Sequence, residues 1–170
     1  KQWKLDLSAV EAAINSKTKL IVINYPHNPT GSLLEAGILH SLIDLARRNG
    51  IYIFSDEVYR LMEVETENRM LPICDLYEKG ISLGVMSKAF GLAGLRIGWI
   101  ATQDSEIRKE AEFFKYYLSI CNSAPSEVLA FIALRAKEKI LHRNHQILKS
   151  NLSLLDTYFE QKRNILDWVR

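Results

Sequence analysis

The apolar residues form short continuous runs in the first half of the chain and recur at helical spacing in the second half. Apolar positions three and four residues apart predict a helix from Leu34 to Asn49, and Gly50 would end it. The order strand, helix, strand, crossover, strand predicts an α/β fold with a mostly parallel sheet, whose last strand can run antiparallel after a short link. Four runs are typical of buried strands, at residues 18–23, 51–54, 81–86 and 97–101.

The first predicted strand is largely apolar and rich in β-branched residues, so we expect both of its faces to be covered. Before it, Ser8 and Glu11 have the spacing of a capping box and predict a short helix.

From Asp104 onward the pattern is helical, which predicts a sheet domain over residues 1–120 and a helical connector over residues 121–170. We expect the connector to contain a helix over residues 126–139 and a longer amphipathic stretch over residues 141–169.

Composition restricts the class of protein. The chain has 170 residues, of which 48% are hydrophobic and 25% charged, with a net charge of +2, as in a soluble globular domain. Basic and acidic residues are interspersed, so no nucleic-acid partner is indicated. Cys74 and Cys121 match no metal or redox spacing, and no apolar run is long enough to span a membrane. We therefore expect a cytoplasmic protein without a membrane partner.

Polar residues follow three of the predicted strands. Asn28 lies in the loop after the first, Asp56 ends the second, and Ser87 and Lys88 follow the third. Parallel α/β sheets bind ligands beyond the carboxyl ends of their strands, so these side chains would surround one crevice.

Lys88 and Arg96 are the most chemically suggestive pair. A lysine at the mouth of a buried strand loses hydration, and its amine becomes a usable nucleophile. An arginine eight residues later can bind an anion with two hydrogen bonds. Together they suit an aldehyde that carries a phosphate, although a surface lysine with a salt-bridged arginine is the plainer alternative.

The motifs, taken together, resemble those of the class I and II aminotransferases, which are fold-type-I enzymes that use pyridoxal 5′-phosphate (PLP). The resemblance rests on four segments: Asn28-Pro29-Thr30-Gly31, Asp56-Glu57-Val58-Tyr59, Ser87-Lys88 and Gly94-Leu95-Arg96-Ile97-Gly98. It implies that residues 1–120 are part of the PLP-binding large domain, and that residues 121–170 lead toward a small domain.

The resemblance also assigns roles. In the family, the lysine matching Lys88 forms the Schiff base with the cofactor and moves a proton on the substrate. The aspartate matching Asp56 pairs with the pyridinium nitrogen, so that the ring can accept electrons. Residues matching Tyr59 and Asn28 hydrogen-bond the ring hydroxyl oxygen. No metal is implied.

The phosphate is held in the family by the arginine matching Arg96, and the Ser87 hydroxyl can assist it. Many members also have Ser or Thr three residues before the lysine, where this chain has Val85. We therefore expect the phosphate to depend more on Arg96, on Ser87 and on groups outside the chain.

Family members run to roughly 400 residues, beyond one ordinary domain, so the chain is expected to be a central section of a longer enzyme. Their phosphate-binding turn precedes the region matching Lys1, and the arginine for the substrate carboxylate follows the region matching Arg170. Asn122 and Ser123 fall where relatives reach across a homodimer interface, although a helix break explains them equally well.

The expected activity is transfer of an amino group from an amino acid to a 2-oxo acid. A PLP-dependent β-eliminating (C–S) lyase of the same fold is the main alternative, and Tyr59 favours transamination because such lyases often have His there. A non-catalytic remnant is the third possibility. His142 and His145 could share a metal, but a solvated helix face is the favoured interpretation.

Overall fold

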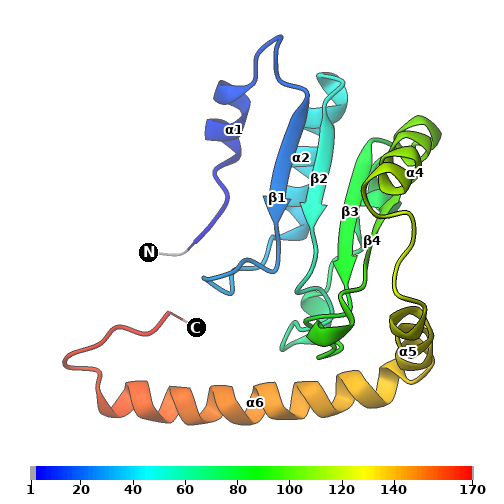
Figure 1. Cartoon of the computed structure of the whole chain (residues 1–170). Helices are drawn as coiled ribbons and strands as arrows, with labels where there is room; N and C mark the ends of the chain where they lie inside the picture. The colour runs from blue at the N-terminus through cyan, green and yellow to red at the C-terminus, as the bar shows by residue number, and fades with distance from the viewer. Residues whose placement is uncertain (1–2, 170) are drawn as a thin grey trace.

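The structure is a computed structural model and describes residues 3–169. Its centre is a four-stranded sheet in the order β1-β2-β3-β4, with helices around it (Figure 1). The first three strands are parallel, and β4 runs antiparallel to β3. This confirms the predicted α/β fold and its mostly parallel sheet. The strands are β1 (Leu20–Asn24), β2 (Tyr52–Asp56), β3 (Gly80–Val85) and β4 (Gly98–Thr102).

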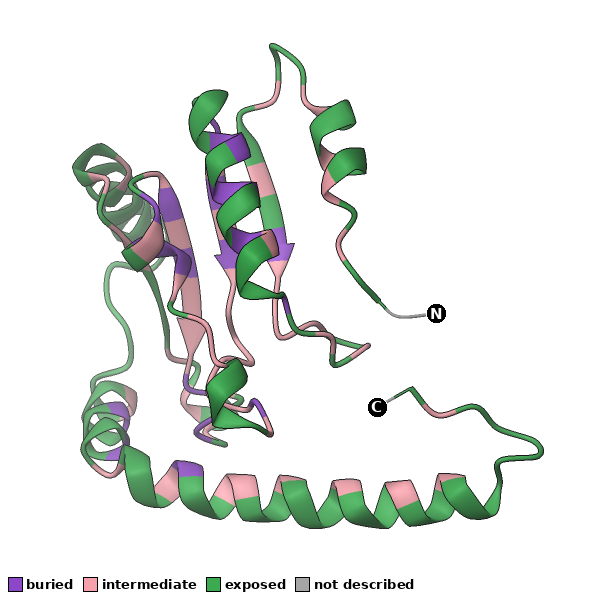
Figure 2. Ribbon diagram, turned by 180° about the vertical axis from the view of Figure 1, so that it is seen from behind, coloured by how far each residue is buried: buried purple, intermediate pink, exposed green. Residues whose placement is uncertain are grey.

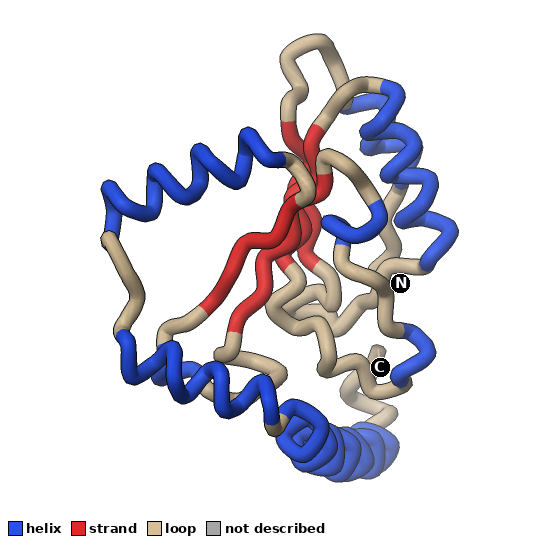
Figure 3. The backbone as a smooth tube through the Cα atoms, turned by 90° about the vertical axis from the view of Figure 1, so that its right-hand side faces the viewer, coloured by secondary structure: helices blue, strands red, loops and turns tan. Residues whose placement is uncertain are grey.

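Helices flank the sheet and cross beneath it. Seen along the sheet, α1 and α2 lie on one side and α4 stands away on the other (Figure 3). The longest helix, α6, runs past the carboxyl ends of the parallel strands (Figure 1). The helices are α1 (Leu7–Ala13), α2 (Ala36–Arg48), α3 (Ile73–Leu76), α4 (Ser105–Ser119), α5 (Ala124–Arg135) and α6 (Lys137–Gln161), with short 3₁₀ turns η1 (Thr66–Asn68) and η2 (Ala93–Leu95).

Two helix boundaries differ from the prediction. The cap of α1 is Asp6, whose carboxylate accepts hydrogen bonds from the amides of Ser8 and Ala9 at 3.0 and 3.1 Å. The Ser8–Glu11 capping box is therefore wrong, because a carboxylate two residues earlier takes the free amides first. The break between α5 and α6 falls at Ala136, earlier than predicted. No helix among residues 3–169 is long and apolar enough to cross a membrane.

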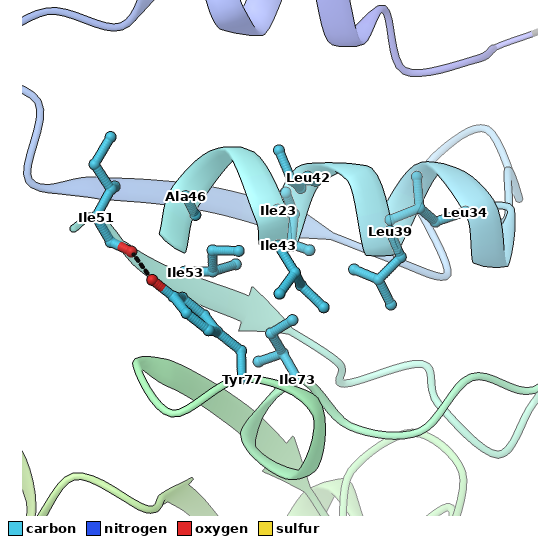
Figure 4. Close-up of a cluster of buried hydrophobic side chains, with 10 residues drawn as sticks. All are labelled: Ile23, Leu34, Leu39, Leu42, Ile43, Ala46, Ile51, Ile53, Ile73 and Tyr77. Carbon is cyan, nitrogen blue, oxygen red and sulfur yellow. Dashed lines mark hydrogen bonds between the residues drawn. The ribbon is translucent and has the colours of Figure 1, made fainter. Parts of the chain in front are cut away.

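The main core lies between α2 and one face of the sheet (Figures 2 and 4). Gly50 follows α2 with a φ of +66°, which a glycine adopts without strain, so the predicted end of this helix is confirmed. The hydroxyl of Tyr77 is buried in this core and donates to the Ile51 carbonyl at 2.7 Å. The buried cluster contains Ile23, Leu34, Leu39, Leu42, Ile43, Ala46, Ile51, Ile53, Ile73 and Tyr77.

The opposite face of the sheet is open in the described part of the chain. Val22 is 65% exposed and Ile100 is 54% exposed. The expectation that the first strand is covered on both faces is therefore wrong for residues 3–169, because its continuous apolar pattern does not reveal which segment supplies the cover. Side chains alternate along a strand, so Asp56 lies on this same open face.

Candidate active site at the carboxyl edge of the sheet

The three parallel strands end at one edge, and the candidate residues begin there. In the strand register, Asp56 is level with Asn24 of β1 and with Leu83 of β3. The loop that contains Asn28 leaves β1 from this edge, and the segment that contains Lys88 leaves β3 from it (Figure 1). The predicted convergence of these segments is therefore present in the fold.

Lys88 and Tyr59 are in contact. The Lys88 ammonium nitrogen lies 5.3 Å from the centroid of the Tyr59 ring, within the range of a cation–π interaction. No hydrogen bond or ion pair within the described chain involves this nitrogen. Lys88 is exposed, so the loss of hydration expected from its position after a buried strand is not provided by residues 3–169. The strand is buried on one face only, and the lysine lies beyond its end.

Asp56 starts the turn that carries Tyr59. Its Oδ1 atom accepts a hydrogen bond from the Val58 amide at 3.2 Å, which bends the chain directly after β2. Within residues 3–169 its other oxygen, Oδ2, accepts no hydrogen bond. Asp56 is half-buried, and within the described chain this oxygen is available to a cationic partner at the sheet edge.

Glu57 supports the same turn from the other face of the sheet, a role that the sequence did not reveal. Its Oε1 atom accepts hydrogen bonds from the Ile73 amide at 2.8 Å and from the Ser82 hydroxyl at 3.0 Å. Burial raises the pKa of this carboxyl, and the two hydrogen bonds partly oppose that rise. Glu57 therefore ties the end of β2 to α3 and β3.

The loop that contains Lys88 is anchored on both sides of the lysine. The Lys88 carbonyl accepts from the amide of Gly91 at 2.9 Å, and Gly91 adopts a φ of +68°, in the region that favours glycine. Residues close to Lys88 in the sequence belong to a second buried cluster. The cluster contains Met86, Ala89, Phe90, Ala130, Ala133 and Leu141. The backbone is held inside while the amine faces outward.

The remaining candidates are Arg96, Asn28 and Ser87. Arg96 is exposed at a φ of +53°, and its guanidinium donates to the Ala93 carbonyl at 3.2 Å. Asn28 is exposed, and Ser87 is half-buried. No hydrogen bond or ion pair between described residues joins Arg96, Asn28 or Ser87 to Lys88 or Asp56.

The donor set fits PLP. An amine suits its aldehyde, a carboxylate suits the ring nitrogen, a phenol and an amide suit the ring hydroxyl oxygen, and a guanidinium suits the phosphate. The corresponding side chains, at or near one edge of the sheet, are those of Lys88, Asp56, Tyr59, Asn28 and Arg96.

Helix α6 also reaches the site, and the predicted solvated helix face is correct for His142 but wrong for His145. His142 is exposed, but His145 is half-buried and its Nε2 atom lies 2.8 Å from the carbonyl oxygen of Leu61. The helical period placed both residues correctly on α6, but only the fold shows which of them faces the sheet. No group of three metal-ligating side chains occurs among residues 3–169.

An α/β sheet with an amine, a phenol and a carboxylate at its carboxyl edge is compatible with a cofactor-binding domain of the PLP type. The family model described as aminotransferase class I and II matches residues 1–169. The chain therefore belongs to the class I and II aminotransferase family.

Individual relatives agree with this assignment. The chain is 28% identical over 170 residues to a kynurenine–oxoglutarate transaminase of Dictyostelium discoideum, covering 98% of this chain and 37% of the relative. It is 36% identical over 99 residues to an aspartate aminotransferase of Thermococcus kodakarensis, covering 58% of this chain and 26% of the relative.

Among solved structures, a PLP-dependent aminotransferase from Streptococcus suis superimposes with a TM-score of 0.87 at 36% identity, covering 94% of this chain and 41% of that protein. The fold is thus that of part of a fold-type-I large domain. The chain spans well under half the length of the relatives it matches.

Proposed function

We propose that the complete protein is a PLP-dependent aminotransferase that moves an amino group from an amino acid to a 2-oxo acid. The observation that carries this proposal is the contact of Lys88 with Tyr59 at the edge of the sheet where β2 ends with Asp56. Relatives named as transaminases support the same reaction type. Their substrates differ, so the proposal extends to the reaction class and not to one amino donor.

When bound, PLP supplies an aldehyde that accepts amines and a ring that accepts an electron pair. We assign to Lys88 the amine that attaches the cofactor and later carries the proton removed from the substrate's α-carbon. The free oxygen of Asp56 would hold the ring nitrogen in its protonated form. Tyr59 would donate a hydrogen bond to the ring hydroxyl oxygen.

Asn28, Ser87 and Arg96 complete the proposed cofactor site. The Asn28 amide would donate to the ring hydroxyl oxygen, and Arg96 would bind the phosphate with help from the Ser87 hydroxyl. Val85 offers the phosphate no hydroxyl, so we expect further phosphate ligands from outside this chain.

We also propose the organisation and setting of the whole protein. Residues 1–120 would belong to the PLP-binding large domain, and residues 121–170 would connect it to a smaller domain. A homodimer is supported by large apolar side chains exposed on α4, which soluble proteins seldom leave uncovered. These include Phe113, Phe114 and Tyr117. We place the enzyme in the cytoplasm.

A half-reaction tests the proposed function. The complete protein, loaded with PLP, is mixed with a panel of amino acids in the absence of any 2-oxo acid. A correct donor should convert the cofactor once to its amine form, releasing one 2-oxo acid per site, and a 2-oxo acid should then restore the starting spectrum. Continuous release of ammonia from a cysteine-like or serine-like substrate would contradict transamination and favour the β-eliminating lyase.

A further inference from the structure

Tyr59 and Lys88 come from two separate segments of the chain. Tyr59 belongs to the turn after β2, and Lys88 to the loop after β3. A cavity of about 130 Å³ is lined by residues of both segments, among them Leu61 and Ala89. Because a cavity lies between parts of the two segments, contacts with a third element can contribute to the spacing between them.

Helix α6 bonds to both segments through two consecutive residues. The Nδ2 atom of Asn144 donates to the Ala89 carbonyl at 2.8 Å, one residue past Lys88. The Nε2 atom of His145 lies 2.8 Å from the Leu61 carbonyl, two residues past Tyr59. A carbonyl oxygen only accepts, so Nε2 must carry the proton in this contact. Each segment thus receives one hydrogen bond from the same rigid helix.

Both contacts are locally supported. The Arg143 guanidinium donates to Asn144 Oδ1 at 3.1 Å, which turns the Nδ2 atom of that amide toward Ala89. Leu141, one turn earlier, is buried against the cluster that contains Ala89 and fixes α6 in place.

The Leu61 contact holds an unfavourable backbone conformation. Leu61 has a φ of +76°, a region that residues with a β-carbon seldom adopt without support from neighbouring groups. The hydrogen bond from His145 fixes the orientation of its peptide group. Without this hydrogen bond, we expect the turn to relax toward a more common backbone conformation and Tyr59 to move with the turn.

We propose that Asn144 and His145 are positioning residues that set the spacing of Lys88 and Tyr59 from α6. The proposal rests on the proposed function only in its consequence for catalysis, because the two hydrogen bonds involve no cofactor atom. Neither residue touches the reacting groups.

Amide hydrogen exchange of the complete, cofactor-free protein tests the structural part. The replacement Asn144→Asp keeps the shape but presents an acceptor to the Ala89 carbonyl, and His145→Phe removes the second donor. Residues 86–92 should exchange at least about tenfold faster in the first variant, and residues 57–63 in the second. His145→Gln, which retains a donor, should restore most of the protection. His142→Ala, on the same helix but exposed, is the matched control.

Kinetics of the PLP-loaded protein test the catalytic part. Both variants should lower kcat about tenfold or more and change KM by less than twofold, since the substrate-binding groups are untouched. Unchanged exchange in both segments, or an equal increase throughout β2 and β3, would overturn the proposal. If the wild type does not transaminate but the exchange pattern is found, the proposed function fails while the positioning role stands.

Discussion

At the scale of single residues, the site depends on two neighbouring carboxylates, Asp56 and Glu57, which face opposite sides of the sheet and have different roles. Asp56 faces the open side with one oxygen free, while Glu57 faces the core and fixes the turn through α3 and β3. Because the raised pKa of Glu57 comes mainly from burial, its perturbation reports a structural role. The neighbouring carboxylate with the free oxygen is the one suited to a cofactor.

The replacement Asp56→Asn tests the role assigned to Asp56. An amide can still accept the Val58 hydrogen bond, so the turn should persist, but it cannot stabilise a protonated ring nitrogen as a carboxylate does. We expect kcat to fall about 10²-fold or more while PLP still binds. Steady-state kinetics and the visible absorption of the bound cofactor are the measurements.

Asp44→Asn is the matched control, because Asp44 is exposed on α2 and pairs only with Arg47 in the described chain. That variant should retain wild-type kinetics. A near-wild-type turnover of Asp56→Asn would remove Asp56 from its assigned role.

At the scale of elements, close packing of α3 against β3 holds the third strand in register. A Cβ atom added at Gly80 would overlap the backbone carbonyl of Ile73, which no side-chain rotation can relieve. Glycine is therefore required where α3 turns into β3.

Gly80→Ala should destabilise the protein by about 1–3 kcal/mol, because the backbone of α3 or β3 must shift to accept the methyl group. Gly37→Ala, in α2 with no atom within 4 Å of the added carbon, should be neutral or stabilising by up to about 1 kcal/mol. Urea unfolding of both variants gives the comparison. Equal stabilities of the two would contradict the packing described here.

Elements set by local chemistry were predictable from sequence, and contacts between distant segments were not. Gly50 ends α2 as predicted, and the short link before β4 correctly indicated an antiparallel strand. The Leu61–His145 contact joins residues 84 positions apart, which no spacing rule reveals. Asn28, Asp56, Ser87 and Lys88 could be proposed because each lies at or after the end of a predicted strand, whereas Glu57 and Asn144 act through contacts that only the fold creates.

At the scale of the whole molecule, one side of the sheet is packed and the other is open within the described chain. Val22 and Ile100 expose apolar surface on that open face, beside the edge where Asp56 lies. The chain spans 37% of the Dictyostelium relative and 41% of the Streptococcus suis structure. The proposed activity is therefore one of the complete protein, in which we expect further segments to cover this face and to add ligands for the phosphate.

The most direct test of the central claim is to locate the residue that attaches PLP. The complete protein is incubated with PLP, reduced with borohydride and digested, and the modified peptide is identified by mass spectrometry. We predict a stable pyridoxyl adduct on Lys88, lost in Lys88→Ala and retained in Lys79→Ala, where Lys79 is a lysine at the opposite end of β3. No adduct in the wild type, or an adduct that persists on another lysine in Lys88→Ala, would contradict the account.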